Sequence, residues 1–225
     1  MLLVSFNISY YFKNLFKHII NMKQTKIIIF GLSIILLILI VYFIFNLTTD
    51  QATKKERYPT MIVIETTQGN IEIELFDKNA PISVANFKKY VSSNFYDGVV
   101  FHRVIKNFMV QTGGFNEDGS EKDTFDPIVL EQTNITGLSN LKGTVSMART
   151  MDPDSATSQF FINTVDNLFL DYKDSKNPGY AVFGKVVSGM DVVLKIENLE
   201  TTTKYDYYQD WPVEDVIIKK VYIKE

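Results

Sequence analysis

The side chains best suited to chemistry lie in one short stretch, residues 101–114, whose sequence is FHRVIKNFMVQTGG. It contains one arginine, Arg103, and one glutamine, Gln111, around the large apolar residues Phe108 and Met109. An arginine side chain stays charged in proteins and offers several N–H donors. These residues predict a shallow apolar pocket with one strong donor at its rim. An ordinary amphipathic hairpin is the alternative interpretation of the same stretch.

Other kinds of catalytic site have little support in the sequence. The chain has no cysteine, which excludes a cysteine nucleophile, thiolate metal sites and disulfides. Only two histidines are present, and His18 lies in the N-terminal tail, so His102 stands alone in the rest of the chain. A single histidine is more often structural than catalytic, and no Gly-x-Ser-x-Gly elbow is found. We therefore expect neither a metal nor a cofactor.

A second group of motifs follows between residues 146 and 185. They are SMARTMDPDSATSQFFIN at 146–163, NLFLD at 167–171 and YAVFGK at 180–185. Together with FHRVIKNFMVQTGG, their order and spacing resemble those of the cyclophilins, the peptidyl-prolyl isomerases. The resemblance covers about residues 60–225. It is strongest to the bacterial-type branch, in which an arginine follows Met-Ala and a tyrosine precedes Ala-Val-Phe-Gly-Lys.

The resemblance implies a role for individual residues. It makes Arg103 the catalytic arginine and Gln111 the glutamine that positions it. It also implies an apolar pocket for a proline ring, beside a groove in which a backbone strand pairs with the substrate. The implied pocket residues are Phe108, Met109, Phe161 and Leu170. The implied groove residues are Ala148, Arg149 and Gln159, with Phe169 and Tyr180 completing the substrate site.

Three positions depart from the pattern of the family. Tyr180 stands where many members have histidine. Phe169 stands where cyclosporin-sensitive members carry tryptophan, which argues against tight cyclosporin binding. Thr112 replaces a glycine of the usual Gln-Gly-Gly, a change that requires ordinary backbone angles at this residue.

The chemistry implied by the resemblance is rotation about X–Pro peptide bonds. Amide resonance opposes this rotation by roughly 18–20 kcal/mol, and X–Pro isomers exchange slowly. The catalyst must favour the twisted amide, whose nitrogen can accept a hydrogen bond from an arginine. Such an enzyme acts on proline-containing polypeptides and needs no cofactor. A non-catalytic peptide-binding module on the same fold is the alternative, although the intact Arg103, Phe108, Met109, Gln111 and Phe161 set argues against it.

Periodicity predicts the elements that must hold these residues. Apolar patterns indicate short strands at 61–65, 70–76, 99–104, 108–112, 143–148, 159–163, 181–187 and 213–223. Helical spacing indicates helices over 82–93 and 189–199. With the resemblance, this pattern predicts a mostly β fold, a closed antiparallel eight-stranded β-barrel capped by two α-helices.

The N-terminal part of the chain has a different character. Residues 1–26 form a basic tail, residues 27–45 carry no charge, and residues 46–59 form a polar linker before the isomerase-like domain at 60–225. A helix over 27–45 would span about 28 Å, close to the roughly 30 Å hydrocarbon core of a bilayer. We expect an uncleaved transmembrane signal-anchor. A cleaved signal peptide, with a secreted enzyme, and a buried core helix are the alternatives.

The charge distribution sets further expectations. The net charge is −3, and the four lysines of residues 1–26 contribute +4, so the remainder carries −7. An acidic globular part without a basic stripe argues against a nucleic-acid partner. The lysines before the apolar run favour an N-terminus in the cytoplasm, with the catalytic domain outside it in a single-pass membrane protein. We expect a monomer, and Met22 is a second candidate for the start of translation.

Overall fold

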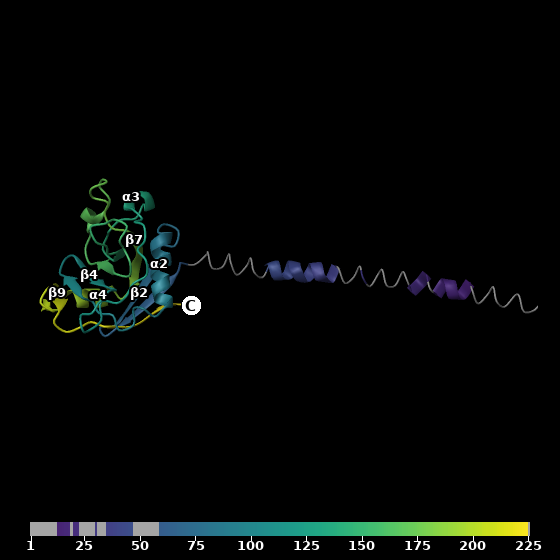
Figure 1. Ribbon diagram of the computed structural model, residues 1–225, viewed down its shortest axis with the longest axis horizontal. Helices are drawn as coiled ribbons and strands as arrows, with labels where there is room; N and C mark the ends of the chain where they lie inside the picture. Colours follow the sequence, from purple (N-terminus) through teal and green to yellow (C-terminus); the bar gives the residue numbers. More distant parts are fainter. Residues whose placement is uncertain (1–12, 19, 23–29, 31–34, 47–58, 225) are drawn as a thin grey trace, which may run out of the picture. The chain divides into compact units, whose positions relative to one another are not determined.

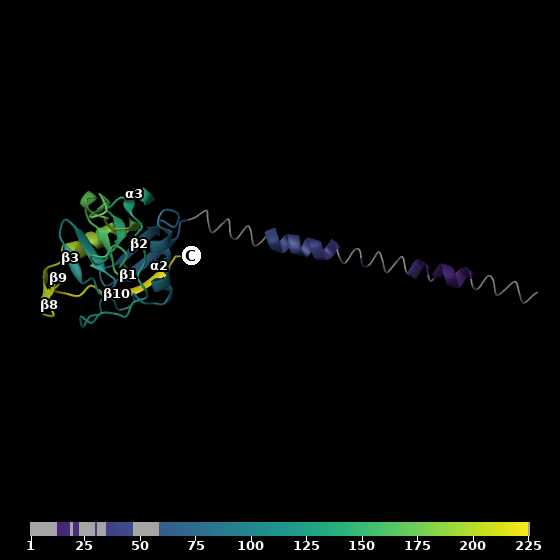
Figure 2. The same ribbon diagram turned by 45° about the horizontal axis from the view of Figure 1, so that its top comes forward.

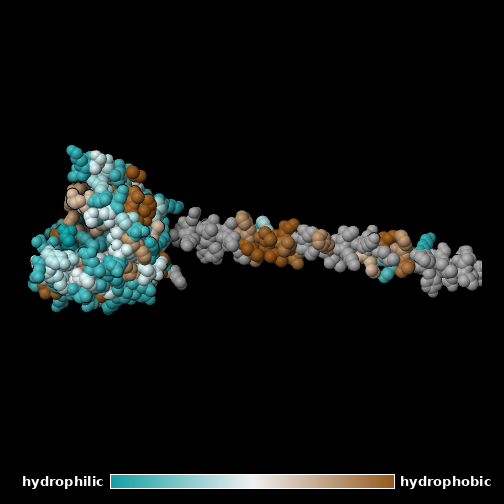
Figure 3. All heavy atoms as spheres, in the orientation of Figure 1, coloured by the Kyte–Doolittle hydropathy of each residue, from teal (hydrophilic) through white to brown (hydrophobic). Residues whose placement is uncertain are grey.

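The computed structural model describes residues 13–18, 20–22, 30, 35–46 and 59–224. The chain divides into two units, Met1–Tyr58 and Pro59–Glu225. The described residues of the first unit are helical, and residues 35–46 present an almost continuous apolar surface (Figure 3). Among the described residues, no helix is both long and apolar enough to cross a membrane. Of the predicted span at 27–45, residues 27–29 and 31–34 lie outside the described residues, as does most of the predicted linker.

The second unit contains the strands of the described residues together with several helices (Figure 1). Its strands are β1 (Met61–Thr66), β2 (Asn70–Leu75), β3 (Arg103–Ile105), β4 (Met109–Thr112), β5 (Thr144–Met147), β6 (Phe160–Asn163), β7 (Val182–Ser188), β8 (Thr201–Lys204), β9 (Tyr208–Pro212) and β10 (Ile218–Ile223). Its helices are α2 (Pro81–Ser92), α3 (Thr133–Thr136), α4 (Met190–Glu197) and the 3-10 turn η1 (Leu168–Leu170). Each of the eight predicted ranges overlaps a strand, but β3 begins at Arg103 instead of residue 99 and β10 at Ile218 instead of residue 213. Strands β8 and β9 were not predicted.

Eight strands form one antiparallel sheet in the order β10-β1-β2-β7-β5-β6-β4-β3. Helix α4 contacts β2, β3 and β4, and helix α2 contacts β7 and β10. Each helix therefore touches strands that are far apart in the order of the sheet, which requires the sheet to curl. Figures 1 and 2 show the two helices against this curled sheet, with the β8–β9 hairpin at the end of the unit away from α2.

The prediction of a closed barrel is wrong, because the edge strands β3 and β10 do not pair with each other. The segments that precede them meet instead, through a bridge between Val100 and Ile217 and a 2.9 Å hydrogen bond from Phe101 N to Val216 O. Strand β3 is only three residues long, and β9 lies beside it. The irregular segments thus take the place of the ladder that would close the sheet.

The main core fills the inside of the curled sheet. In β2, Ile71, Ile73 and Leu75 are buried, as their alternation predicted. The side chain of Phe87 from α2 packs edge-on against Phe160 of β6 at 5.3 Å between ring centroids. The sheet and α2 therefore share one core, which leaves the strand residues on the outer side of the curl free to form a site.

Candidate active site

The hairpin formed by β3 and β4 places the predicted catalytic arginine. Arg103 pairs with Gln111 across the two strands, and Ile105 pairs with Met109. A turn at residues 106–108 joins the two strands, with Asn107 at φ 56°, a left-handed conformation that asparagine tolerates better than most residues. The turn folds the chain back, so that Arg103 and Gln111 lie opposite each other at the open end of the hairpin.

A cavity of about 270 Å³ lies beside this hairpin, and every residue that lines it was predicted from the sequence. The lining residues are Arg103, Phe108, Met109, Gln111, Ala148, Arg149, Phe161, Leu170 and Tyr180. The other two predicted site residues do not line it. Gln159 lies behind Gln111, and Phe169 is exposed and stacks on Phe108 with 5.6 Å between ring centroids.

The floor of the cavity is apolar. Met109, Phe161 and Leu170 are buried and form a cluster of their own, separate from the main core. The ring of Tyr180 meets that of Phe161 edge to face at 5.8 Å. Because neighbouring strand residues point to opposite faces, Phe161 belongs to this cluster while Phe160 belongs to the main core. The cavity floor is therefore a well-packed hydrophobic surface whose size suits a small apolar ring.

The two arginines of the cavity differ in how firmly they are held. Arg149 donates to the carbonyl oxygen of Gly179 from Nε and Nη2, at 3.0 and 2.8 Å, and its guanidinium lies 4.5 Å from the Tyr180 ring centre. Arg103 is 42% exposed, and its Nε lies 3.8 Å from a carboxylate oxygen of Asp210. Arg149 thus belongs to the wall, whereas the guanidinium of Arg103 is available to a ligand.

Two contacts of the site were not found by sequence reasoning. Asp210, the ion-pair partner of Arg103, lies in β9, a strand that the sequence did not predict. The side-chain amide of Gln111 donates a 2.8 Å hydrogen bond to Gln159. Both contacts join segments that are far apart in the chain, and no local pattern signals them. The role of Gln111 in positioning Arg103 stays a prediction.

His102 does not line the cavity and is almost fully buried. Its ring packs 4.5 Å from that of Phe115, and its Nδ1 atom has no hydrogen-bond partner in the described part of the chain. Burial lowers the pKa of His102 to about 4, although hydrogen bonds with the backbone of Val100 and the side chain of Gln159 act in the opposite direction. The imidazole is therefore neutral at pH 7 and structural, as expected from its isolation in the sequence.

The substitution of threonine for glycine at residue 112 fits the local backbone. Thr112 ends β4 with ordinary strand angles, and its hydroxyl donates a 2.8 Å hydrogen bond to the carbonyl oxygen of Val100. The next residue, Gly113, has φ +98°, and a Cβ atom there would lie 2.6 Å from the carbonyl oxygen of Ser158. The glycine that the fold requires at this point is therefore Gly113, and it is retained.

The curled antiparallel sheet and the arginine at the rim of an apolar pocket agree with the cyclophilin resemblance of the sequence. The sequence profile of the family "Cyclophilin type peptidyl-prolyl cis-trans isomerase/CLD" matches residues 61–223. The chain belongs to this family, and it is a peptidyl-prolyl cis-trans isomerase.

Individual relatives agree with this assignment. A peptidyl-prolyl cis-trans isomerase of Acinetobacter baylyi is 55% identical over 165 residues, which cover 73% of this chain and 86% of the relative. Peptidyl-prolyl cis-trans isomerase B of Escherichia coli is 47% identical over 167 residues, 73% of this chain and all of the relative. The crystal structure of a Cryptosporidium parvum cyclophilin-type isomerase has a TM-score of 0.59 at 27% identity and covers 75% of this chain and 99% of its own.

Proposed function

We propose that the cavity binds the proline of a polypeptide substrate and that Arg103 catalyses rotation of the preceding peptide bond. The observation that carries this proposal is the partly exposed guanidinium of Arg103 at the rim of the Met109–Phe161–Leu170 floor. A related Cryptosporidium parvum isomerase was crystallised in the presence of the dipeptide Ala-Pro. In this chain, the apolar floor of the cavity can hold the proline ring of such a peptide, with the guanidinium of Arg103 beside it.

The proposed mechanism needs no proton transfer and no nucleophile. The proline ring enters the apolar floor, which excludes water from one side of the amide. A terminal N–H of Arg103 then donates to the proline nitrogen as the amide twists and its lone pair becomes localised. This hydrogen bond is stronger in the twisted state than in either planar isomer, because resonance withdraws the lone pair in the planar amide. Preferential binding of the twisted state lowers the barrier.

The residues around the pocket hold the flanking parts of the peptide in this proposal. Gln111, Ala148, Arg149 and Tyr180 belong to the wall of the cavity. Gln159 supports this wall through its hydrogen bond with Gln111, and Phe169 stacks on Phe108. The backbone N–H of Ala148 already donates to the carbonyl oxygen of Gln159 at 2.9 Å, which fixes this wall. A fixed wall sets the register of the substrate and so aligns its proline with Arg103.

The test of this proposal compares Arg103→Ala and Arg103→Lys with the wild type in a proline-peptide isomerisation assay. We expect the alanine variant at Arg103 to lose about 100-fold or more in kcat/KM, which is typical of a lost electrostatic donor. Lysine restores the charge without the planar fork and recovers only part of the rate. Unchanged turnover in Arg103→Ala would overturn the mechanism. Undiminished peptide binding without turnover in the wild type would support the non-catalytic alternative.

We also propose that residues 27–45 anchor the enzyme in the cell membrane, with the domain at 60–225 outside the cytoplasm and assisting the folding of exported proteins. Support comes from the uncharged run itself and from the apolar surface over residues 35–46 (Figure 3). The four lysines of residues 1–26 favour this orientation. Membrane fractionation with N-terminal sequencing of the mature protein tests it. A first residue beyond Asn46 would establish cleavage and a secreted enzyme instead.

A further inference from the structure

The β8–β9 hairpin is an addition to the curled sheet, inserted between α4 and β10. Its two strands pair only with each other, with Thr202 opposite Trp211 and Lys204 opposite Tyr208. An isolated two-stranded hairpin is marginally stable in water, so contacts with the rest of the unit must hold it in place. Those contacts determine what the hairpin presents to the active site.

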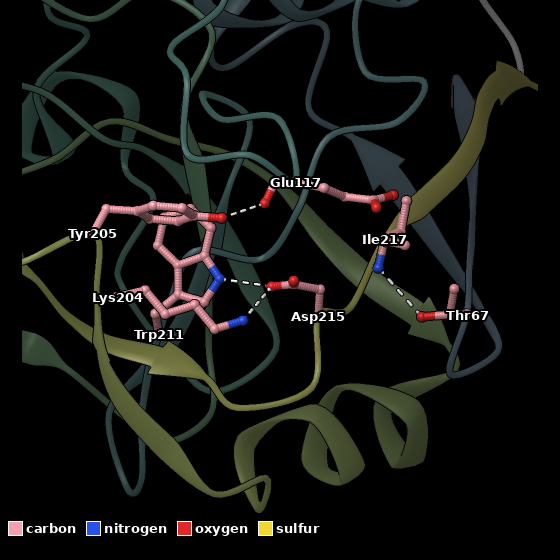
Figure 4. Close-up of polar contacts among 7 residues, drawn as sticks. All are labelled: Thr67, Glu117, Lys204, Tyr205, Trp211, Asp215 and Ile217. Atoms are coloured by element: carbon pink, nitrogen blue, oxygen red, sulfur yellow. Dashed lines mark hydrogen bonds and ion pairs between the residues drawn. The ribbon is translucent and has the colours of Figure 1, made fainter.

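Several buried and polar contacts fix the hairpin (Figure 4). Trp211 is fully buried, and its indole N–H donates to Asp215 at 2.7 Å. The ammonium group of Lys204 donates to the same carboxylate oxygen at 3.0 Å. The Tyr205 hydroxyl donates to the carbonyl oxygen of Glu117, in a loop that also supplies Phe115 to the aromatic cluster around Trp211. The hairpin is therefore attached at both of its strands.

This attachment holds Asp210 beside the active-site arginine. Asp210 immediately precedes the buried Trp211 and has φ 60°, a left-handed conformation that aspartate and asparagine tolerate. Its carboxylate oxygen lies 3.8 Å from Nε of Arg103, and the two side chains are 41% and 42% exposed. Within residues 59–224, this carboxylate is the ion-pair partner of Arg103.

We propose that Asp210 is a positioning residue for Arg103, an inference that rests on the proposed catalytic role of that arginine. The separation is too long for a hydrogen bond, so the attraction is that of an ion pair. It acts at Nε and leaves both terminal nitrogens of the guanidinium for the substrate amide. A half-exposed arginine otherwise samples many rotamers, and each rotamer away from the pocket is inactive. The attached hairpin thus supplies a negative charge that favours rotamers with the guanidinium at the rim of the pocket.

The test uses the full-length chain in detergent and a proline peptide without charged side chains. Asp210→Asn and Asp210→Gly both remove the charge. Asparagine keeps a side chain of the same shape, glycine has none, and both residues tolerate the left-handed backbone conformation. Asp206→Asn is the matched control, because Asp206 lies in the same hairpin, is exposed and has φ 68°. We expect kcat to fall about twofold to fivefold in both Asp210 variants with little change in KM, and to stay at the wild-type value in Asp206→Asn.

A second measurement separates positioning from a general structural effect. The ¹⁵N order parameter of Arg103 Nε should fall in Asp210→Asn and not in Asp206→Asn, and salt should lower kcat of the wild type toward that of Asp210→Asn. Equal kcat and equal order parameters in the two asparagine variants would overturn the inference. If Arg103→Ala remains active, the proposed catalytic role itself fails. If Arg103→Ala is inactive and Asp210→Asn is not impaired, only the positioning role fails.

Discussion

The side-chain amide of Gln111 donates a 2.8 Å hydrogen bond to the side-chain oxygen of Gln159, and this contact ties together two segments that flank the groove. The backbone oxygen of Gln159 also accepts from Ala148, at the end of β5. A Cβ atom on Gly114 would lie 2.6 Å from the Gln159 amide nitrogen, so the glycine makes room for this side chain. Gln159 is therefore a junction between β4 and β5, although it does not line the cavity.

This relationship predicts that Gln111 and Gln159 act as one unit. Replacing either with alanine removes the shared hydrogen bond and loosens the groove wall, so each single variant should lose roughly fivefold in kcat/KM. The double variant should be little worse than either single one, because the second substitution has no bond left to break. Steady-state kinetics of the four proteins gives the coupling directly. Losses that multiply in the double variant would show that the two glutamines act independently.

Substitutions at the neighbouring residues Phe160 and Phe161 should separate an effect on stability from an effect on substrate binding. Both are buried, but Phe160 packs in the main core and Phe161 in the cavity floor. Phe160→Leu and Phe161→Leu should each lower the free energy of unfolding by about 1–2 kcal/mol. Only Phe161→Leu should raise KM for a proline peptide, by roughly threefold to tenfold, since it removes apolar contact area from the substrate. Denaturant unfolding and steady-state kinetics on the same samples measure the two effects. A raised KM in Phe160→Leu would contradict the assignment of Phe160 to the core and of Phe161 to the cavity floor.

Local patterns were sufficient to predict much of the fold. The alternation in β2 and the helical spacing around Phe87 are consequences of one buried face, so the sequence shows them directly. Closure of the sheet was predicted wrongly, because it depends on whether β3 and β10 pair, and both edges depart from regular strands near Val100 and Ile217. The pattern of apolar residues in one edge strand does not indicate which strand it pairs with.

The β8–β9 hairpin escaped prediction for a related reason. Strand β8 has the sequence TTTK and is mostly exposed, so it shows no apolar alternation. In β9 the positive φ of Asp210 interrupts the regular strand conformation. The buried residues of the hairpin are Trp211 and Pro212 at the end of β9, with Tyr208 only partly covered. The lining of the cavity was predictable because its residues occur in short motifs. The contacts of Arg103 with Asp210 and of Gln111 with Gln159 were not, since side chains from distant segments make them.

The exposed Phe169 predicts a gain of inhibitor binding on substitution. Its ring is 59% exposed and stacks on Phe108, and cyclosporin-sensitive members of the family carry tryptophan at the matching position. Phe169→Trp adds an indole N–H donor and more apolar area, so we expect the cyclosporin concentration for half inhibition to fall by about tenfold. Leu168→Trp is the control, because Leu168 is similarly exposed in the same turn but does not occupy the position that matches the tryptophan of the family. An equal gain in both variants would attribute the effect to a new surface tryptophan rather than to the site.

The buried His102 predicts a specific dependence of stability on pH. Its pKa falls from the ordinary 6.5 to about 4 in the folded protein, chiefly because burial disfavours the charged imidazolium. Between these two values the unfolded chain binds a proton that the folded protein does not. Stability is therefore fully present above pH 6.5 and is lost as the pH falls toward 4, by about 3 kcal/mol in total.

Denaturant unfolding of the wild type and of His102→Leu from pH 7.5 to 4 measures this contribution. Carboxyl groups also titrate in the lower part of the range, so the informative quantity is the difference in slope between the two proteins. The variant should lose less stability than the wild type between pH 6.5 and 4.5, whatever its stability at pH 7.5. Parallel curves would mean that His102 binds its proton equally well in both states, which the lack of a hydrogen-bond partner at Nδ1 and the contact with Phe115 make physically unfavourable.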